Sequence, residues 1–294
     1  MKKQKTNKHA YIIMAHNKFD ILYELLKDLD DERNNIFLHI DSKSKGFDSK
    51  YAMEIIKKGK LYLVDRMNVH WGGFSQIECI VKMLKYASNI GYHEYYHFMV
   101  GVEFPLKDQS FIHNFFEENE GKEFIGFDWK DFNYLDKIKY YHPFNEYGRN
   151  NNIIQKILNK FRIICVAIQK LFKVNLIRKY NIKFVKGNAN WSITQDLVDF
   201  ILSKENEIYH IYKHSFCADE IFIHSIVYNS NFINNVYDIQ DEYHSSMRLS
   251  NWNNQYNRYC LKDLSMLINS NRLFARKIDG EDALELIDAI RKNR

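Results

Sequence analysis

The sequence predicts an α/β fold, with a mostly parallel sheet that has helices on both faces. Along the first half, short apolar runs typical of buried strands alternate with segments that repeat apolar residues at helical spacing. Hydrophobic residues make up 46% of the 294-residue chain, which is enough for a sizeable core. The chain has only 2 Pro and 11 Gly and no linker-like stretch, so we expect a single domain over residues 1–294.

The expected elements follow one another closely in the first half. We expect strands at residues 11–15, 36–40, 61–64, 95–100 and 124–127, and helices at 19–29 and 75–86. In sheets of this kind, ligands bind beyond the carboxyl ends of the strands. That rule points at His16-Asn17, Asp41-Ser42 and Gly101-Val102-Glu103.

Charge and cysteine content narrow the class of protein. The formal net charge of +5 is too small to indicate a nucleic-acid-binding protein, but it suits a protein that handles phosphates or lies near an anionic membrane. The four cysteines are far apart in the sequence, which argues against disulfides and a zinc site and favours the cytoplasm: Cys79, Cys165, Cys217 and Cys260. The apolar run after the basic N-terminus is too short for a signal peptide or a membrane span.

A long segment at residues 150–180 combines apolar and basic residues at helical spacing. One interpretation is a pair of ordinary surface helices with solvated lysines. The other is a basic amphipathic element that lies on the inner face of a membrane, as a peripheral contact. The segment carries too many charges to cross a bilayer.

The sequence offers no strong metal or mononucleotide motif. Asp28-Leu29-Asp30 is followed by Asp31, but it ends an amphipathic helix, where a solvated acidic face is the simpler interpretation. No HExxH, GxGxxG or Walker-type motif occurs. We therefore expect no metal cofactor.

Two charged groups in the second half allow both a structural and a chemical interpretation. Asp219-Glu220 opens an apolar segment, where Asp219 could cap a helix or either carboxylate could be a rigidly held general base. Arg272, Arg276 and Lys277 lie close together, either as an ordinary basic turn or as a phosphate site.

Four groups of segments together resemble the core-2/I-branching β-1,6-N-acetylglucosaminyltransferase family, which includes the protein O-xylosyltransferases. They are residues 11–17 (YIIMAHN) with 39–43 (HIDSK), 71–75 (WGGFS) with 96–106 (YHFMVGVEFPL), 187–194 (GNANWSIT) with 218–220 (ADE), and 248–252 (RLSNW) with 273–279 (LFARKID). The resemblance covers roughly residues 10–280 and is weakest at 128–182. It implies a GT-A-like glycosyltransferase fold with a Rossmann-like sheet, and an inverting, metal-independent transfer from a UDP-sugar.

The resemblance also divides the domain and assigns site residues. It implies a nucleotide-binding half at 10–127, a variable basic helical insertion at 128–182 and an acceptor and catalytic half at 183–294. Glu220 falls on the catalytic base. Lys277 falls on a lysine that contacts the diphosphate, with Arg258 as its partnering arginine and Arg248 as the alternative.

The remaining expected contacts surround the donor. His16 and Asp41, with Ala15 beside them, fall where the family contacts uridine. Trp252 falls on an aromatic residue beside the sugar. We expect Glu103, Asp219 and Trp191 at the same sugar and acceptor site.

The chemistry agrees with this resemblance. A departing diphosphate gains negative charge, which Arg and Lys can neutralise in place of a metal ion, while a carboxylate takes the proton of the attacking hydroxyl. The sequence thus predicts transfer of GlcNAc, xylose, galactose or glucose from a UDP-sugar to a glycan or lipid-linked glycan, with no nucleic-acid partner. Two alternatives stay open: a hydrolase that uses Glu220 with Glu103 or Asp219, and a non-catalytic module that binds glycan or membrane.

Overall fold

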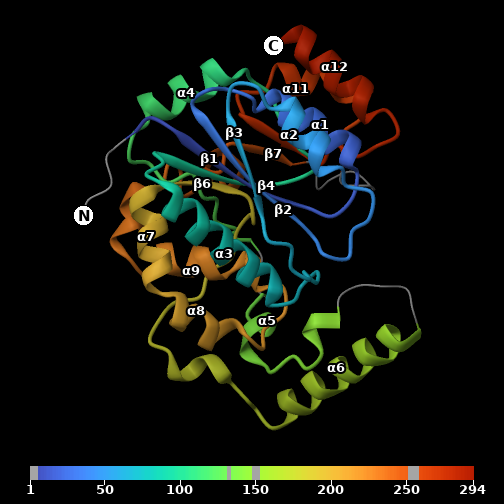
Figure 1. Ribbon diagram of the computed structural model, residues 1–294. Helices are drawn as coiled ribbons and strands as arrows, with labels where there is room; N and C mark the ends of the chain where they lie inside the picture. Colours follow the sequence, from blue (N-terminus) through green and yellow to red (C-terminus); the bar gives the residue numbers. More distant parts are fainter. Residues whose placement is uncertain (1–5, 131–133, 148–152, 251–257) are drawn as a thin grey trace.

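A five-stranded sheet with the order β3-β2-β1-β4-β6 forms the centre of the molecule (Figure 1). A computed structural model describes residues 6–130, 134–147, 153–250 and 258–294. The strands of this sheet are β1 (His9–Ala15), β2 (Asn34–Ile40), β3 (Lys60–Val64), β4 (Tyr95–Val100) and β6 (Trp191–Thr194). The first four are parallel and β6 is antiparallel to β4. The predicted α/β class is therefore confirmed.

A second, smaller sheet with the order β5-β8-β7 lies beside the first. Its strands are β5 (Glu103–Pro105), β7 (Arg248–Ser250) and β8 (Phe274–Arg276). Glu103 and Ser250 both pair with Arg276, so one end of this sheet brings together chain segments that are far apart in sequence.

Helices and 3-10 turns fill the rest of the described chain. The α-helices are α1 (Phe19–Asp28), α2 (Ser49–Ile55), α3 (Ser75–Ile90), α4 (Gln109–Glu118), α5 (Asp136–Lys139), α6 (Ile153–Leu171), α7 (Gln195–Ser203), α8 (Glu205–Tyr212), α9 (Phe222–Tyr228), α10 (Glu242–Ser245), α11 (Leu264–Ile268) and α12 (Ala283–Asn293). The 3-10 turns are η1 (Asn145–Tyr147), η2 (Leu176–Lys179), η3 (Ala218–Glu220), η4 (Asn231–Asn235) and η5 (Leu261–Asp263).

The hydrophobic core consists of two layers, one on each face of the central sheet. Successive side chains of a strand point to opposite faces. Accordingly, Ala10 and Ile12 of β1 pack in one layer with residues of α3 and α7, while Tyr11 and Ile13 pack in the other with residues of α1, α4 and α12. Both faces are covered, so β1 and β2 are buried almost throughout, and their central residues form continuous apolar runs, as in other buried parallel strands.

One predicted strand was wrong. The run Phe124–Phe127 makes only an isolated bridge through Phe124 to Ser192, and the fifth strand of the sheet is β6. At Gly126 the chain passes directly beneath the backbone of Glu242, and a Cβ there would lie 1.9 Å from the Glu242 carbonyl oxygen. The run is apolar because it is buried, and a short buried run has the same pattern whether or not it pairs as a strand.

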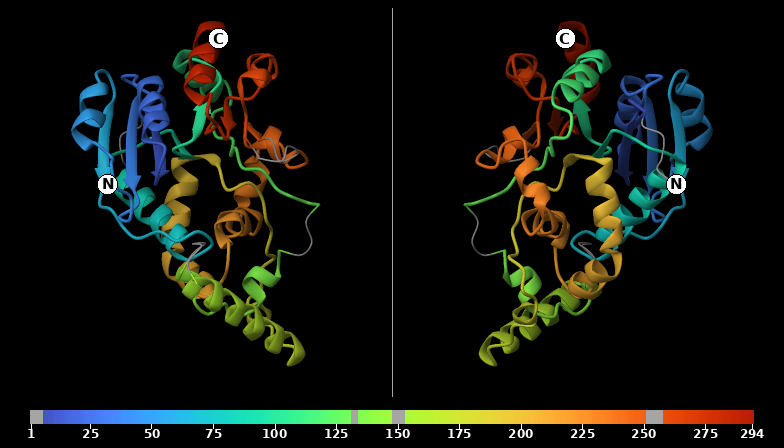
Figure 2. Two further views of the ribbon diagram at one scale, coloured as in Figure 1. Left: turned by 90° about the vertical axis from the view of Figure 1, so that its right-hand side faces the viewer. Right: turned by 90° about the vertical axis from the view of Figure 1, so that its left-hand side faces the viewer.

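Helix α6 differs from the other long helices because none of its residues is buried. Both views in Figure 2 place it at the edge of the molecule, away from the central sheet. The prediction of a helix within residues 150–180 is confirmed, and η2 follows α6 in the same segment.

Candidate active site

Three segments meet at the carboxyl edge of the central sheet. Ala15 pairs with Ile40, and Met14 with Val100, so the residues that follow β1, β2 and β4 share one edge. His16 is exposed there, whereas Ala15 is buried and its carbonyl accepts a hydrogen bond from the Asp41 backbone N–H (3.0 Å). His16 and Asp41 thus lie at the same edge of the sheet, as the strand pattern predicted.

The Asp41 carboxylate is already engaged by its own loop. It accepts a hydrogen bond from the Lys43 backbone N–H (2.8 Å) and forms an ion pair with the Lys43 Nζ (3.0 Å). Although its side chain is solvent-accessible, His16 is partly desolvated by its neighbours, which lowers its pKa; Asp41 raises that pKa and Lys277 lowers it further. This edge of the sheet is therefore within electrostatic reach of Lys277.

Lys277 directly follows β8 and is tied to the end of β4. The Ile278 backbone N–H donates to the Val102 carbonyl (2.9 Å), and the Tyr259 backbone N–H donates to the Lys277 carbonyl (2.8 Å). Burial lowers the pKa of the half-buried Lys277, and the charges of Arg276 and Arg258 lower it further. Such a group of neighbouring cations is a suitable environment for a polyanion.

Arg258 and Arg276 are positioned by different partners. The Arg258 Nε lies 3.3 Å from an oxygen of Asp279. Arg276 donates through Nη1 to the Asn190 side-chain oxygen (2.6 Å). The sequence named Arg276 only as part of a possible phosphate site with Arg272 and Lys277, whereas the family resemblance assigned the diphosphate contacts to Lys277, Arg258 and Arg248.

The adjacent carboxylates lie on a short turn rather than at a helix cap. Asp219 and Glu220 belong to η3, and α9 begins after Ile221 without a side-chain cap. The capping interpretation of Asp219 is therefore wrong. Asp219 instead accepts a hydrogen bond from the Gln76 amide (3.2 Å), and Glu220 forms an ion pair with Lys137 of α5 (2.8 Å).

Electrostatic coupling connects these carboxylates to the cations. Burial is the main cause that raises the pKa of Asp219 to about 6, with a further contribution from Glu220, and Lys137 and Arg276 oppose the rise. Arg276 thus acts on Asp219 and also on Lys277. Arg276 is therefore within electrostatic reach of the ADE turn (Ala218–Glu220) and of Lys277, with which it forms the RK pair.

A third acidic group lies within electrostatic reach of Glu220 and was not predicted. Glu242 opens α10, and burial raises its pKa to about 7, with Asp128 and Glu220 contributing and Lys186 opposing. Lys186 also lies 3.4 Å from Asp128. No local motif marks Glu242, because its neighbours come from distant segments.

Gly187 makes this arrangement sterically possible. Its backbone N–H donates to the Glu220 carbonyl (3.0 Å), and a Cβ at this position would lie 1.8 Å from the Gly126 carbonyl oxygen. A glycine is therefore required where these segments cross.

Two residues expected to contact ligands are instead buried in the core. Arg248 is 0% exposed, and its Nε lies 2.5 Å from Glu103, which is also 0% exposed. The two side chains form an ion pair inside the small sheet, and neither is accessible to a diphosphate or a sugar. This burial also removes Glu103 as one of the paired carboxylates of a hydrolase.

The two expected tryptophans have different outcomes. Trp191 is fully buried and stacks on Phe98, with 5.2 Å between ring centroids, so its assignment to the sugar site is wrong. The large aromatic side chain of Trp191 packs in the hydrophobic core instead. Trp252 lies outside the described residues, and its expected contact with the sugar stays a prediction.

The acidic Asp28–Asp31 segment is occupied by structural contacts. Asp28 pairs with Arg291 (2.9 Å), Asp31 pairs with Arg33 (2.8 Å), and Asp30 accepts three backbone N–H groups of residues 57–59. Across the described ranges, no three His, Cys, Asp or Glu side chains converge as metal ligands would.

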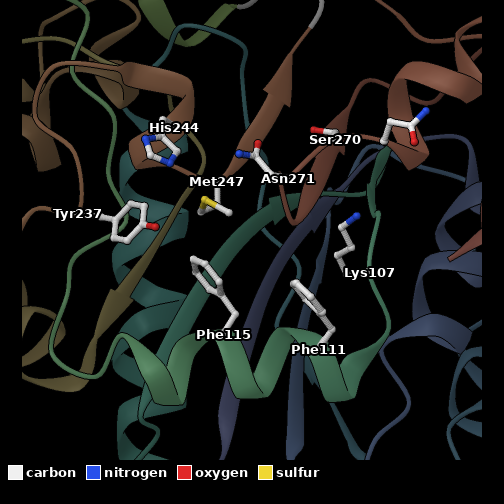
Figure 3. Close-up of a pocket in the computed structure, with 9 residues that line it drawn as sticks. Lys107, Phe111, Phe115, Tyr237, His244, Met247, Ser270 and Asn271 are labelled. Atoms are coloured by element: carbon white, nitrogen blue, oxygen red, sulfur yellow. The ribbon is translucent and has the colours of Figure 1, made fainter.

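A cavity of about 450 Å³ lies at the opposite end of the small sheet from Arg276 (Figure 3). Phe111 and Phe115 of α4 form one wall, and Tyr237, His244 and Met247 lie across from them. Neither the RK pair nor the ADE turn lines this cavity, so it is separate from the candidate active site.

Comparisons with known proteins identify the family. No curated protein matches the sequence significantly. A crystal structure of core-mannan synthase A (CmsA/Ktr4) from Aspergillus fumigatus in a Mn/GDP form is similar over 76% of this chain and 69% of that chain, with a TM-score of 0.36 and 14% identity. The family model of the Core-2/I-Branching enzyme matches residues 9–268. The chain therefore belongs to the core-2/I-branching enzyme family and is a glycosyltransferase.

Proposed function

We propose that the protein is an inverting, metal-independent enzyme that moves a sugar from a UDP-sugar to a hydroxyl group of a glycan or lipid-linked glycan. The observation that carries the proposal is the segment at residues 187–190, which contacts both halves of the site. The Gly187 backbone N–H donates to the Glu220 carbonyl (3.0 Å), and the Asn190 side-chain oxygen accepts a hydrogen bond from Arg276 (2.6 Å), next to Lys277. One short segment thus connects a carboxylate suited to an incoming hydroxyl with cations suited to a departing diphosphate.

The donor would lie against the cationic group. Lys277 and Arg258, with Arg276 as an addition, would bind the diphosphate oxygens through charge-assisted hydrogen bonds that strengthen as the leaving group gains charge. His16, Asp41 and the Ala15 backbone, which lie near Lys277, would contact the uridine. GlcNAc, xylose, galactose and glucose remain the candidate sugars.

Glu220 would take the proton of the attacking hydroxyl. Its ion pair with Lys137 holds the carboxylate in a fixed position, which a general base requires. A single displacement at the anomeric carbon would invert its configuration through a transition state with oxocarbenium character. Asp219 would act as a neighbour that positions the turn through Gln76.

We place this reaction in the cytoplasm. Among the described residues, which include all four cysteines, no disulfide forms, and this fits a reducing compartment. The modest net charge supports a partner with phosphates rather than nucleic acid.

The first test is the thermal midpoint of the protein with UDP, with and without EDTA. We expect UDP to raise the midpoint equally in both, because side-chain cations and not a metal would hold the diphosphate. A stabilisation that disappears with EDTA and returns with Mn²⁺ would contradict metal independence.

The second test separates the base from its surroundings. We expect Glu220→Gln to reduce transfer by at least about a hundredfold while UDP still stabilises the protein. Glu205→Gln is a matched control, because Glu205 forms a comparable ion pair with Lys85 (2.7 Å), between α3 and α8. Retained transfer in Glu220→Gln would rule out Glu220 as the base.

A further inference from the structure

Helix α6 is amphipathic, and polar side chains attach it to the protein, together with one ring contact between Phe161 and Phe144 (5.8 Å between centroids). Gln169 exchanges hydrogen bonds with the backbone of Tyr141 (2.8 Å each way), and Lys170 pairs with Asp136 of α5 (2.5 Å). The guanidinium of Arg162 lies 4.0 Å from the ring centroid of Phe216. Since Arg162 and Gln169 are seven residues apart, these contacts come from one side of the helix.

The other side of α6 presents apolar side chains to solvent. Its exposed apolar residues, between 48% and 81% accessible, are Ile153, Ile154, Ile157, Phe161, Ile163, Ile164, Ile168 and Leu171. Most of them recur at spacings of three or four residues, which places them in a single stripe. A continuous exposed apolar stripe on a soluble domain indicates an interaction surface.

The charge of the segment indicates which kind of partner binds this apolar stripe. No Asp or Glu occurs between Glu146 and Asp196. Within residues 153–179 the cationic side chains are Lys156, Lys160, Arg162, Lys170, Lys173, Arg178 and Lys179. A second copy of the same helix would bring like charges together, whereas an anionic lipid surface would attract these cations and accept the apolar stripe.

We propose that α6 is a peripheral membrane anchor that binds anionic lipid surfaces through its apolar stripe and flanking lysines. Within the part of the chain that the structure describes, no helix is long and apolar enough to span a bilayer, so α6 would lie in the plane of the interface. The position of α6 at the edge of the molecule leaves its outer side open to such a surface (Figures 1 and 2).

The test is co-sedimentation of the full chain with vesicles of phosphatidylcholine, with or without phosphatidylglycerol. It needs no sugar donor, so its result is independent of the proposed reaction. We expect binding to the anionic vesicles, weaker binding to the neutral ones, and loss of binding at high salt. Absence of binding to anionic vesicles would overturn the proposal.

Variants then locate the binding surface. We expect Ile154→Asp/Ile157→Asp/Ile164→Asp to reduce the vesicle-bound fraction by about tenfold or more, since each change places a charge in the interface. The matched control is Met53→Asp/Ile90→Asp/Leu284→Asp, which makes the same change at exposed apolar residues outside α6, and it should bind as the wild type does. All the residues changed are exposed, and unchanged circular dichroism would confirm that both variants fold.

A third variant tests the contribution of charge. Lys156→Gln/Lys160→Gln/Lys173→Gln should keep the fold and lose most of the preference for anionic vesicles. Equal sedimentation of the α6 aspartate variant and the wild type would overturn the proposal. It would also be overturned if the wild type ignored vesicles but formed a dimer that the α6 aspartate variant dissociates, because the stripe would then bind a second copy.

Discussion

Arg276 and Lys277 are consecutive residues, but they serve the site from different sides. Arg276 donates to Asn190 and acts on Asp219, while Lys277 lies near His16 and Arg258. In the proposed reaction, Lys277 would bind the leaving group, and Arg276 would link it to the acceptor side.

At this scale we predict the effect of Lys277→Ala. Removing one charge-assisted contact of about 1.5–3 kcal/mol should weaken UDP binding by about ten- to hundredfold. Isothermal titration with UDP measures this, and Lys292→Ala on α12, at an exposed position, is the control. Unchanged UDP affinity in Lys277→Ala would remove Lys277 from the diphosphate site.

At the scale of elements, the small sheet fixes the cations through a buried ion pair. Glu103 on β5 pairs with Arg248 on β7, and its other oxygen accepts a hydrogen bond from Asn190 (2.6 Å), the residue that also holds Arg276. Both charged groups are fully buried. The pair is thus a positioning device behind the site.

We predict that Arg248→Met destabilises the protein by about 3–5 kcal/mol, because Glu103 is left buried without its partner. The double variant Arg248→Met/Glu103→Leu should recover part of this loss, since it leaves no uncompensated charge. Urea unfolding of both variants measures the two free energies. A double variant that is no more stable than Arg248→Met would contradict this account.

Gly187 gives a second prediction at the element scale. Its Cβ would collide with the Gly126 carbonyl, so Gly187→Ala must displace the backbone that holds Glu220. We expect a loss of stability of about 1–3 kcal/mol and a loss of transfer activity. Gly91→Ala, where no atom lies within 4 Å of the added Cβ, should change neither quantity appreciably.

The element scale also shows what the sequence could predict. Four parallel strands and two helices had clear periodicity, and the RK and ADE segments had recognisable motifs. Burial was harder to predict. Arg248 and Glu103 are polar residues that would be expected at the surface, and only their pairing across two distant strands allows them to be buried. Glu242 and Lys137 reach Glu220 through tertiary contacts that leave no local signature.

At the scale of the whole molecule, buried neutral histidines make stability depend on pH. Burial lowers the pKa of His224 to about 3, against 6.5 when it is unfolded. Between these values the unfolded chain binds a proton that the folded chain does not. The contribution of His224 is therefore fully favourable above pH 6.5 and is lost progressively as pH falls towards 3.

We predict that replacing this residue flattens the pH dependence. The unfolding free energy of His224→Leu should fall less steeply than that of the wild type, by about 1.4 kcal/mol for each pH unit between 6 and 4. Urea unfolding at several pH values measures the difference, in which the contributions of the other titrating groups cancel. Parallel curves for the two proteins would contradict a neutral, buried His224.

Two neighbouring residues of α5 reach in opposite directions: Asp136 holds Lys170 of α6, and Lys137 holds Glu220. Deleting α6, for example to improve solubility, would therefore remove the partner of Asp136 and weaken the support of Lys137, which pairs with Glu220. If this shortened chain reacted more slowly with a freely dissolved acceptor, the cause would be a less firmly positioned Lys137 and not the loss of membrane binding.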